Sequence, residues 1–239
     1  MPTISIASTD RVFILTGAGI SAESGLPTFR AEDGLWAGFR VEDVCTPGAW
    51  RRDPTAVWAF YSARRAQGRK ANPNPAHFAL AELEAQLSGR YFLCTQNVDD
   101  LHERAGSRNL IHMHGELAKS RCERECGRPP AGDRAVYASL DEVARCACGG
   151  RMRPHIVFFG EIPLEMRRIE REITESTLMI VIGTSGNVYP AAGFVHRARQ
   201  SGAKTVYVGP EAPLNAEEFD QIIEGKAGEV LPGLFAVQS

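Results

Sequence analysis

Short apolar runs alternate with helical stretches along most of the chain, and this alternation constrains the fold more than any other feature. The runs are rich in β-branched and aromatic residues, and turn-forming residues follow them; they span 12–16, 91–95, 110–113, 178–182 and 205–208. Apolar residues recur every three or four positions over 54–69, 75–87, 163–176 and 190–201. This order predicts a doubly wound, mostly parallel, Rossmann-like α/β sheet that binds ligands at the carboxyl ends of its strands.

Two segments depart from the alternation. Residues 31–74 hold no convincing strand, so we predict a helical insertion there. Residues 119–154 have little periodicity, contain a Pro129-Pro130 pair and carry four of the six cysteines, which predicts a small metal-supported lobe. The remaining residues, 1–30, 75–118 and 155–239, are expected to build the main sheet domain.

The composition excludes several classes of protein. The 27 Lys and Arg residues nearly balance the 29 Asp and Glu residues, so the formal net charge of −2 indicates neither a nucleic-acid-binding protein nor an acidic disordered chain. The N-terminal residues show no basic signal region, and the nearby apolar run 12–15 is too short for a membrane span. We expect a cytoplasmic protein with no nucleic-acid or membrane partner.

A glycine-rich segment follows the first predicted strand. The pattern Gly17-x-Gly19-x-x-Ala22 fits the dinucleotide fingerprint, in which glycines let the backbone approach a pyrophosphate. Gly25 and Pro27 should stop the helix early, so the nucleotide would be held differently from that of a dehydrogenase. The alternative is a glycine-rich turn made for tight packing.

Polar residues follow three further strands. Residues 95–102 contain amides and carboxylates suited to hold a sugar or a water, and Gly183, Thr184 and Ser185 form a second loop suited to a phosphate or ribose. His112 and His114 should point the same way in an extended segment, but only His114 meets a glycine that opens room for a substrate. A structural role is the alternative for such a histidine.

The clustered cysteines predict a closed, structural zinc site. Their spacing is unusual, because three residues separate Cys122 from Cys126 and only one separates Cys146 from Cys148, whereas two is common in zinc sites. We expect Cys45 and Cys94 to be small buried hydrophobic residues.

Taken together, these motifs resemble the sirtuin family in their order and spacing. The resemblance covers nearly the whole chain and includes residues 17–30, 95–99, 112–115, the four cysteines, 153–161 and 183–185. It is greatest to the bacterial and mitochondrial branch that removes acidic acyl groups. The resemblance implies an NAD-dependent protein-lysine deacylase with a Rossmann-like NAD-binding domain and a small zinc lobe, yielding nicotinamide, deacylated lysine and 2′-O-acyl-ADP-ribose.

The resemblance also implies residue roles. His114 would be the base that activates a ribose hydroxyl. Residues implied to contact NAD are Gly17, Ala18, Gly19, Ser21, Ala22, Phe29, Arg30, Gln96, Asn97, Asp99, Gly183, Thr184, Ser185 and Ala227.

The substrate would be an acyl-lysine protein or peptide, bound to a monomeric enzyme. Residues 156–161 resemble the family's edge strand, which pairs with the substrate backbone; Val157 and Phe158 would line the lysine tunnel, and Gly160 and Glu161 complete the segment.

Tyr61 and Arg64 would mark the acyl subsite. They are three residues apart, share a helix face and resemble the carboxylate-binding pair of the desuccinylase and demalonylase branch. A surface Arg beside a packed Tyr is the alternative. That branch has a small residue that leaves space for a longer acyl group, and in this chain we place it at Val41.

One departure from the family pattern affects the adenosine site. Gly209 stands where many sirtuins have an Asn that touches the adenosine ribose, so Glu211 would have to substitute and the adenine would lean on residues 225–227. The competing functions are ADP-ribosyl transfer or NAD hydrolysis, deacetylation without acidic-acyl preference, and a non-enzymatic NAD-sensing module.

Overall fold

A six-stranded parallel sheet forms the centre of the computed structural model, which describes residues 3–28, 35–36 and 39–238. Its strand order is β12-β11-β10-β2-β5-β6, and every neighbouring pair is parallel. The strands are β2 (Val12–Thr16), β5 (Tyr91–Thr95), β6 (Leu110–His112), β10 (Leu178–Ile182), β11 (Lys204–Gly209) and β12 (Gln221–Glu224). The predicted fold class is therefore confirmed.

The sheet order reverses between β2 and β10. The chain runs outward from β2 through β5 to β6, then returns to β10 on the other side of β2 and continues to β11 and β12. In open α/β sheets, ligands bind at the carboxyl ends of the strands where the order reverses. The two glycine-rich loops after β2 and β10 both lie at this point.

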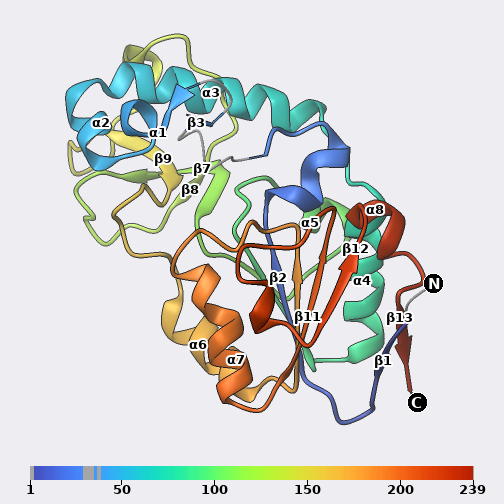
Figure 1. The fold of residues 1–239 in the computed structure, drawn as a ribbon. Coiled ribbons are helices and arrows are strands. Elements are labelled where there is room, and N and C mark those ends of the chain that lie inside the picture. The colour runs from blue at the N-terminus through green and yellow to red at the C-terminus, as the bar shows by residue number, and fades with distance from the viewer. Residues whose placement is uncertain (1–2, 29–34, 37–38, 239) are drawn as a thin grey trace.

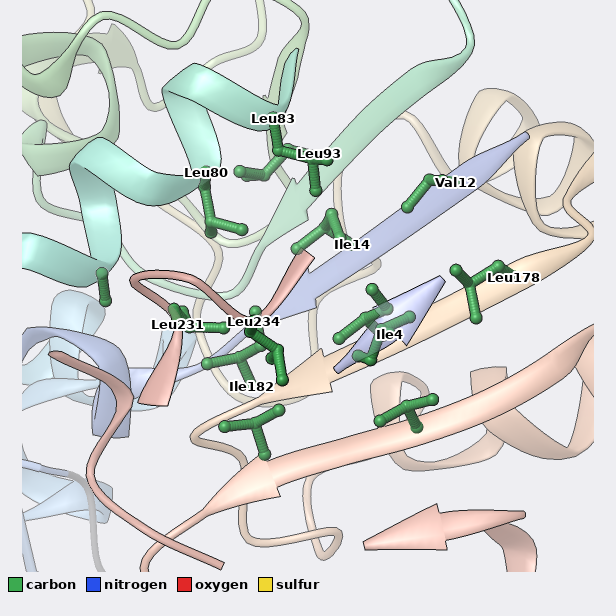
Figure 2. Packing of buried hydrophobic residues seen from close by; sticks show 14 of the residues in the cluster. Ile4, Val12, Ile14, Leu80, Leu83, Leu93, Leu178, Ile182, Leu231 and Leu234 are labelled. Atoms are coloured by element: carbon green, nitrogen blue, oxygen red, sulfur yellow. The ribbon is translucent and has the colours of Figure 1, made fainter. Parts of the chain in front are cut away.

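Helices cover the two faces of the sheet (Figure 1). Strand side chains alternate between faces, so Ile14 of β2 belongs to one core cluster and Phe13 to the other. One face packs against α4 (Pro75–Leu87) and α8 (Ala227–Val230), and Figure 2 shows Leu80 and Leu83 of α4 in that cluster. The other face packs against α6 (Met166–Glu175) and α7 (Phe194–Gln200).

A second group of elements lies beyond one end of the sheet (Figure 1). It contains the helices α1 (Val41–Val44), α2 (Pro47–Arg52) and α3 (Pro54–Lys70), and the antiparallel strands β7 (Gly115–Cys122), β8 (Ala131–Gly132) and β9 (Met152–Ile156). Arg65 of α3 joins the two parts of this group, because its guanidinium donates to the carbonyl oxygens of Leu117, Lys119 and Ala135 and forms an ion pair with Asp133. The boundaries of the three predicted regions stay a prediction.

The structure differs from the sequence predictions in its small elements. The short antiparallel pair β3 (Leu35–Trp36) and β4 (Phe39–Arg40) lies where we predicted no strand. β1 (Ile4–Ile6) pairs in parallel with β13 (Phe235–Val237), a contact between the chain ends that no local pattern predicts. α5 (Leu101–Ala105) and the 3₁₀ helices Ala18–Ser24, Leu140–Glu142, Ala191–Gly193 and Ala216–Glu218 complete the structure. Over the described residues, no helix combines the length and apolarity needed to cross a bilayer.

Candidate active site

A cavity of about 790 Å³ opens at the carboxyl ends of the strands. It gathers most of the predicted site residues from six separate segments. Those that line it are Gly17, Ala18, Gly19, Ser21, Tyr61, Arg64, Gln96, Asn97, Asp99, His114, Val157, Phe158, Gly160, Glu161, Gly183, Thr184 and Ser185.

Two of the described residues predicted to contact NAD are not among those that line the cavity. Ala22 is exposed beside it, and Ala227 is buried at the start of α8. Phe29 and Arg30 lie outside the described residues. Their contacts with NAD stay predictions.

The two glycine-rich loops pack directly against each other. The amide of Gly19 donates to the carbonyl oxygen of Gly183 at 2.9 Å. A Cβ atom at Gly17 would lie 2.8 Å from that same oxygen, so only glycine allows this approach. The glycines therefore serve tight packing, which was the alternative interpretation, and the packing brings both loops to the wall of one cavity.

A hydrogen-bond network joins the first loop to the residues after β5. The Asn97 side-chain amide donates to the carbonyl of Gly17 at 3.1 Å and to the Ser21 hydroxyl at 3.2 Å. The Ser21 hydroxyl donates to the Asp99 carboxylate at 3.2 Å. Burial raises the pKa of Asp99. These polar groups are thus fixed before any ligand arrives.

His114 has the geometry of a neutral base. Its Nδ1 lies 3.1 Å from the carbonyl oxygen of Gln96, which can only accept a hydrogen bond. Nδ1 therefore carries the proton and Nε2 has a free lone pair. Burial lowers the pKa of His114, so the ring is neutral near pH 7.

His112, two residues earlier, is placed differently. It does not line the cavity; its Nδ1 lies 2.8 Å from the carbonyl oxygen of Asn97 and its Nε2 lies 2.7 Å from the Glu103 carboxylate. Burial is the largest single influence and lowers the pKa of His112, but its hydrogen bonds to Glu103 and Asn97, together with the charges of Glu103 and Glu116, make the net shift upward. His112 therefore supports the loop that carries Asn97.

Tyr61 and Arg64 lie in the cavity wall together with Cys45. The Tyr61 hydroxyl donates to Cys45 Sγ at 3.4 Å. The Nε and Nη1 atoms of Arg64 are buried and have no hydrogen-bond partner among the described residues. The guanidinium lies over the Phe60 ring, 5.4 Å from its centre, which leaves these two N–H groups without an acceptor. Buried N–H groups of a charged side chain are costly unless an anion or water joins them.

The small residue beside Tyr61 is Cys45, and our placement of Val41 there was wrong. Val41 packs into the core at the start of α1 and does not line the cavity. Cys45 directly follows that helix, and its Sγ faces the Tyr61 hydroxyl. The prediction that Cys45 is buried is confirmed, but the thiol is also part of the cavity wall.

The predicted edge strand 156–161 is a strand only at its first residue. β9 ends at Ile156, and the next amides are used within the protein: Val157 donates to the His114 carbonyl and Phe159 to the Cys45 carbonyl, both at 2.9 Å. These two bonds tie the segment to His114 on one side and to Cys45, the neighbour of Tyr61, on the other.

The Glu161 carboxylate is occupied by protein groups. It accepts hydrogen bonds from Arg153 at 2.7 and 3.0 Å, from Arg121 at 3.0 Å and from the Phe158 amide at 2.8 Å. The Arg153 guanidinium lies 3.7 Å from the centre of the Phe158 ring. The Glu161 side chain therefore positions Phe158, and any substrate contact at residue 161 would come from its main chain.

The four predicted zinc ligands come together. Their Sγ atoms all lie within 4.8 Å of one another, with Cys122 and Cys148 at 3.5 Å and Cys126 and Cys146 at 3.6 Å. Zinc–thiolate bonds of about 2.3 Å place tetrahedral sulfur atoms about 3.8 Å apart, so this donor set fits zinc. None of the four lines the cavity, as expected of a structural site.

Comparisons with known proteins identify the family of the chain, and the match includes most of the cavity residues. A family model described as "Sir2 family" matches residues 17–190, which is more than half of the chain. The chain belongs to the Sir2 family.

Two similar sirtuins are named "NAD-dependent protein deacylase". The one from Caulobacter vibrioides is 52% identical over 227 residues, covering 93% of this chain and 94% of that protein. The one from Shewanella oneidensis is 49% identical over 225 residues, covering 93% and 92%.

Solved structures of sirtuins agree with the fold. A Sir2 homologue in complex with NAD has 41% identity and a TM-score of 0.85, covering 95% of this chain and 89% of that chain. A Sir2 protein bound to an acetylated peptide has 30% identity and a TM-score of 0.80, covering 94% and 92%.

Several cavity residues were missed by the sequence analysis. Gln67 and Gly68 lie near Arg64, and Tyr207 and Asn215 lie near the second glycine loop. Cys45 and Tyr207 occupy apolar positions in the sequence, and only the packing of distant elements turns them toward the cavity.

Proposed function

We propose that this sirtuin removes succinyl and malonyl groups from protein lysines in preference to acetyl groups. The chain is an NAD-dependent protein deacylase, as its relatives at about 50% identity are. The observation that carries the acidic-acyl preference is the Arg64 side chain, whose buried Nε and Nη1 have no hydrogen-bond partner among the described residues and which lines the same cavity as His114. A carboxylate at the end of the acyl chain would satisfy it as a charge-assisted pair.

The cavity fits NAD because two glycine loops meet at the sheet's switch point beside a preorganised amide and carboxylate. NAD, when bound, supplies the ribose that accepts the acyl group, and the products are nicotinamide, deacylated lysine and 2′-O-acyl-ADP-ribose. Asn97 and Asp99 would orient the ribose and the carboxamide.

His114 would accept the proton of a ribose hydroxyl at Nε2. Its Nδ1 bond to Gln96 keeps the ring in the required tautomer. Val157 and Phe158 would enclose the lysine stem, and Arg64 and Tyr61 would bind the acyl carboxylate. For Tyr61 to do so, its hydroxyl would turn from Cys45 to the carboxylate, a stronger acceptor than the thiol.

The substrate would be an acyl-lysine segment of a protein. The acetylated peptide in the Sir2 structure described above supports this class of partner. Monomeric state and cytoplasmic location belong to the same proposal.

The test is an activity profile of the purified protein on matched peptides carrying acetyl, malonyl, succinyl and glutaryl lysine. We expect succinyl or malonyl peptides to give the highest kcat/KM, with nicotinamide release dependent on peptide. A higher value for acetyl lysine would indicate a plain deacetylase. Equal nicotinamide release without peptide would indicate NAD hydrolysis instead.

A further inference from the structure

Tyr207 fills the space that a side chain at Gly209 would need. The two residues are two positions apart on β11, so their Cα–Cβ directions share a face of the sheet. A Cβ atom added to Gly209 would lie 2.3 Å from the Tyr207 hydroxyl oxygen and 2.7 Å from the adjoining ring carbon. The phenol and a side chain at 209 therefore exclude each other.

The Tyr207 phenol is fixed against the second glycine loop. Its hydroxyl donates to the carbonyl oxygen of Thr184 at 3.0 Å. The ring is buried and packs 5.4 Å, centre to centre, from the ring of Phe219. Burial, followed by the charge of Glu211, raises the pKa of Tyr207 to about 12, so the hydroxyl keeps its proton at neutral pH.

The sheet order indicates which half of NAD this phenol would serve. His114 follows β6 at one end of the order, whereas Tyr207 is on β11, four strands away, which is about 19 Å at the usual strand spacing. The reacting ribose must lie within reach of His114. The other half of NAD, the adenosine, then extends toward β10 and β11.

We propose that Tyr207 is a positioning residue for the adenosine half of NAD. Its phenol takes the place of a side chain at 209 and holds the Thr184 carbonyl, so that the backbone of the 183–185 loop faces the nucleotide in a fixed arrangement. The proposal rests on NAD being the co-substrate. It gives Tyr207, and not Glu211, the role in adenosine binding that is left open by the missing Asn at position 209.

The first test is the affinity for ADP-ribose, measured by calorimetry on the full chain. Tyr207→Phe removes only the hydroxyl that holds the Thr184 carbonyl, so the ligand must then order the 183–185 loop, and a cost of at most one hydrogen bond predicts about 2- to 10-fold weaker binding. The melting temperature and the KM for the acyl peptide should stay close to those of the original protein. The matched control is Tyr91→Phe, because the Tyr91 hydroxyl is buried in the same sheet, lies outside the cavity and has no hydrogen-bond partner in the described part of the chain.

The second test uses the mutual exclusion of the two side chains. Gly209→Ala should weaken ADP-ribose binding when Tyr207 is present but have little further effect in Tyr207→Ala, because the added methyl group then has room. Unchanged binding in Tyr207→Phe, or an equal effect of Gly209→Ala in both backgrounds, would overturn the proposal. If the original protein bound no ADP-ribose, the proposed function itself would fail.

Discussion

The Nδ1 of His114 donates a hydrogen bond to the carbonyl oxygen of Gln96, 3.1 Å away. This contact joins the end of β6 to the end of β5 and fixes the tautomer of the imidazole. Nε2 is therefore the nitrogen that can take a proton.

Replacing this base should abolish turnover without removing the nucleotide site. His114→Asn is expected to lower kcat about 10²- to 10⁴-fold for acetyl and succinyl peptides alike, the usual contribution of a general base. ADP-ribose affinity should change less than about 3-fold, because the two glycine loops and Asn97, which hold the nucleotide in this proposal, are unchanged. His196→Asn, an exposed change on α7, is the control. Turnover within 3-fold of the original protein would rule out His114 as the base.

The assignment of His114 as the base predicts how kcat depends on pH. The pKa of His114 is below the ordinary value of 6.5, and only the neutral ring can accept a proton. The kcat should therefore be constant near pH 7 and fall as pH decreases through that lowered pKa. A kcat that already falls between pH 8 and 7 would contradict the assignment.

Buried histidines should make the fold sensitive to acid. Burial lowers the pKa of His77 to about 4, and it also lowers the pKa of His102, whose ring lies 5.0 Å away. When the pKa of a histidine is lower in the folded than in the unfolded chain, the fold keeps its full stability above the unfolded pKa of about 6.5. The stability decreases as the pH falls toward 4, because the unfolded chain then binds a proton that the folded chain does not.

For His77 the expected loss between pH 7 and pH 5 is about 2 kcal/mol of unfolding free energy. Urea unfolding at the two pH values measures it, and His77→Gln should show a smaller difference. Equal pH differences for the two proteins would show that His77 does not titrate on unfolding.

Zinc should be structural. We expect about one equivalent of zinc in protein purified without added metal, and a lower melting temperature together with loss of metal in Cys122→Ala. Cys94→Ala, a buried cysteine outside the cluster, should keep its metal. Active protein with less than half an equivalent of any metal would contradict the site.

Glu161 should act on substrate binding through Phe158. Glu161→Gln weakens the charge-assisted bonds to Arg121 and Arg153, so we expect the KM for acyl peptides to rise about 10-fold for acetyl and succinyl lysine equally. ADP-ribose affinity should not change. The exposed Glu170→Gln on α6 serves as the control. An effect on ADP-ribose binding equal to that on peptide KM would indicate general damage instead.

Much of the fold was predictable because its signals are local. Apolar runs such as 178–182 form buried strands, and Pro54 and Pro75 begin helices where Asp53 and Asn74 cap them. The sheet then brings residues that follow its strands, such as Asn97 and His114, to one edge.

The rest depends on contacts between distant segments. Cys45 and Tyr61 are sixteen positions apart on different elements, so helix spacing could not pair them. The placement at Val41 came from the family resemblance and not from a contact. Residues 157–161 do not continue β9, because a turn forms in which Glu161 bonds back to Phe158 through both its amide and its carboxylate. The pairing of this segment with a substrate stays a prediction.

The acyl selectivity of Arg64→Met tests the central claim most directly. We expect kcat/KM for a succinyl peptide to fall about 100-fold, because two charge-assisted hydrogen bonds are lost, while that for the matched acetyl peptide stays within about 3-fold. Arg64→Lys should keep part of the succinyl activity, and Arg51→Met, an exposed change on α2, should keep all of it. An equal loss of both activities in Arg64→Met would contradict the account.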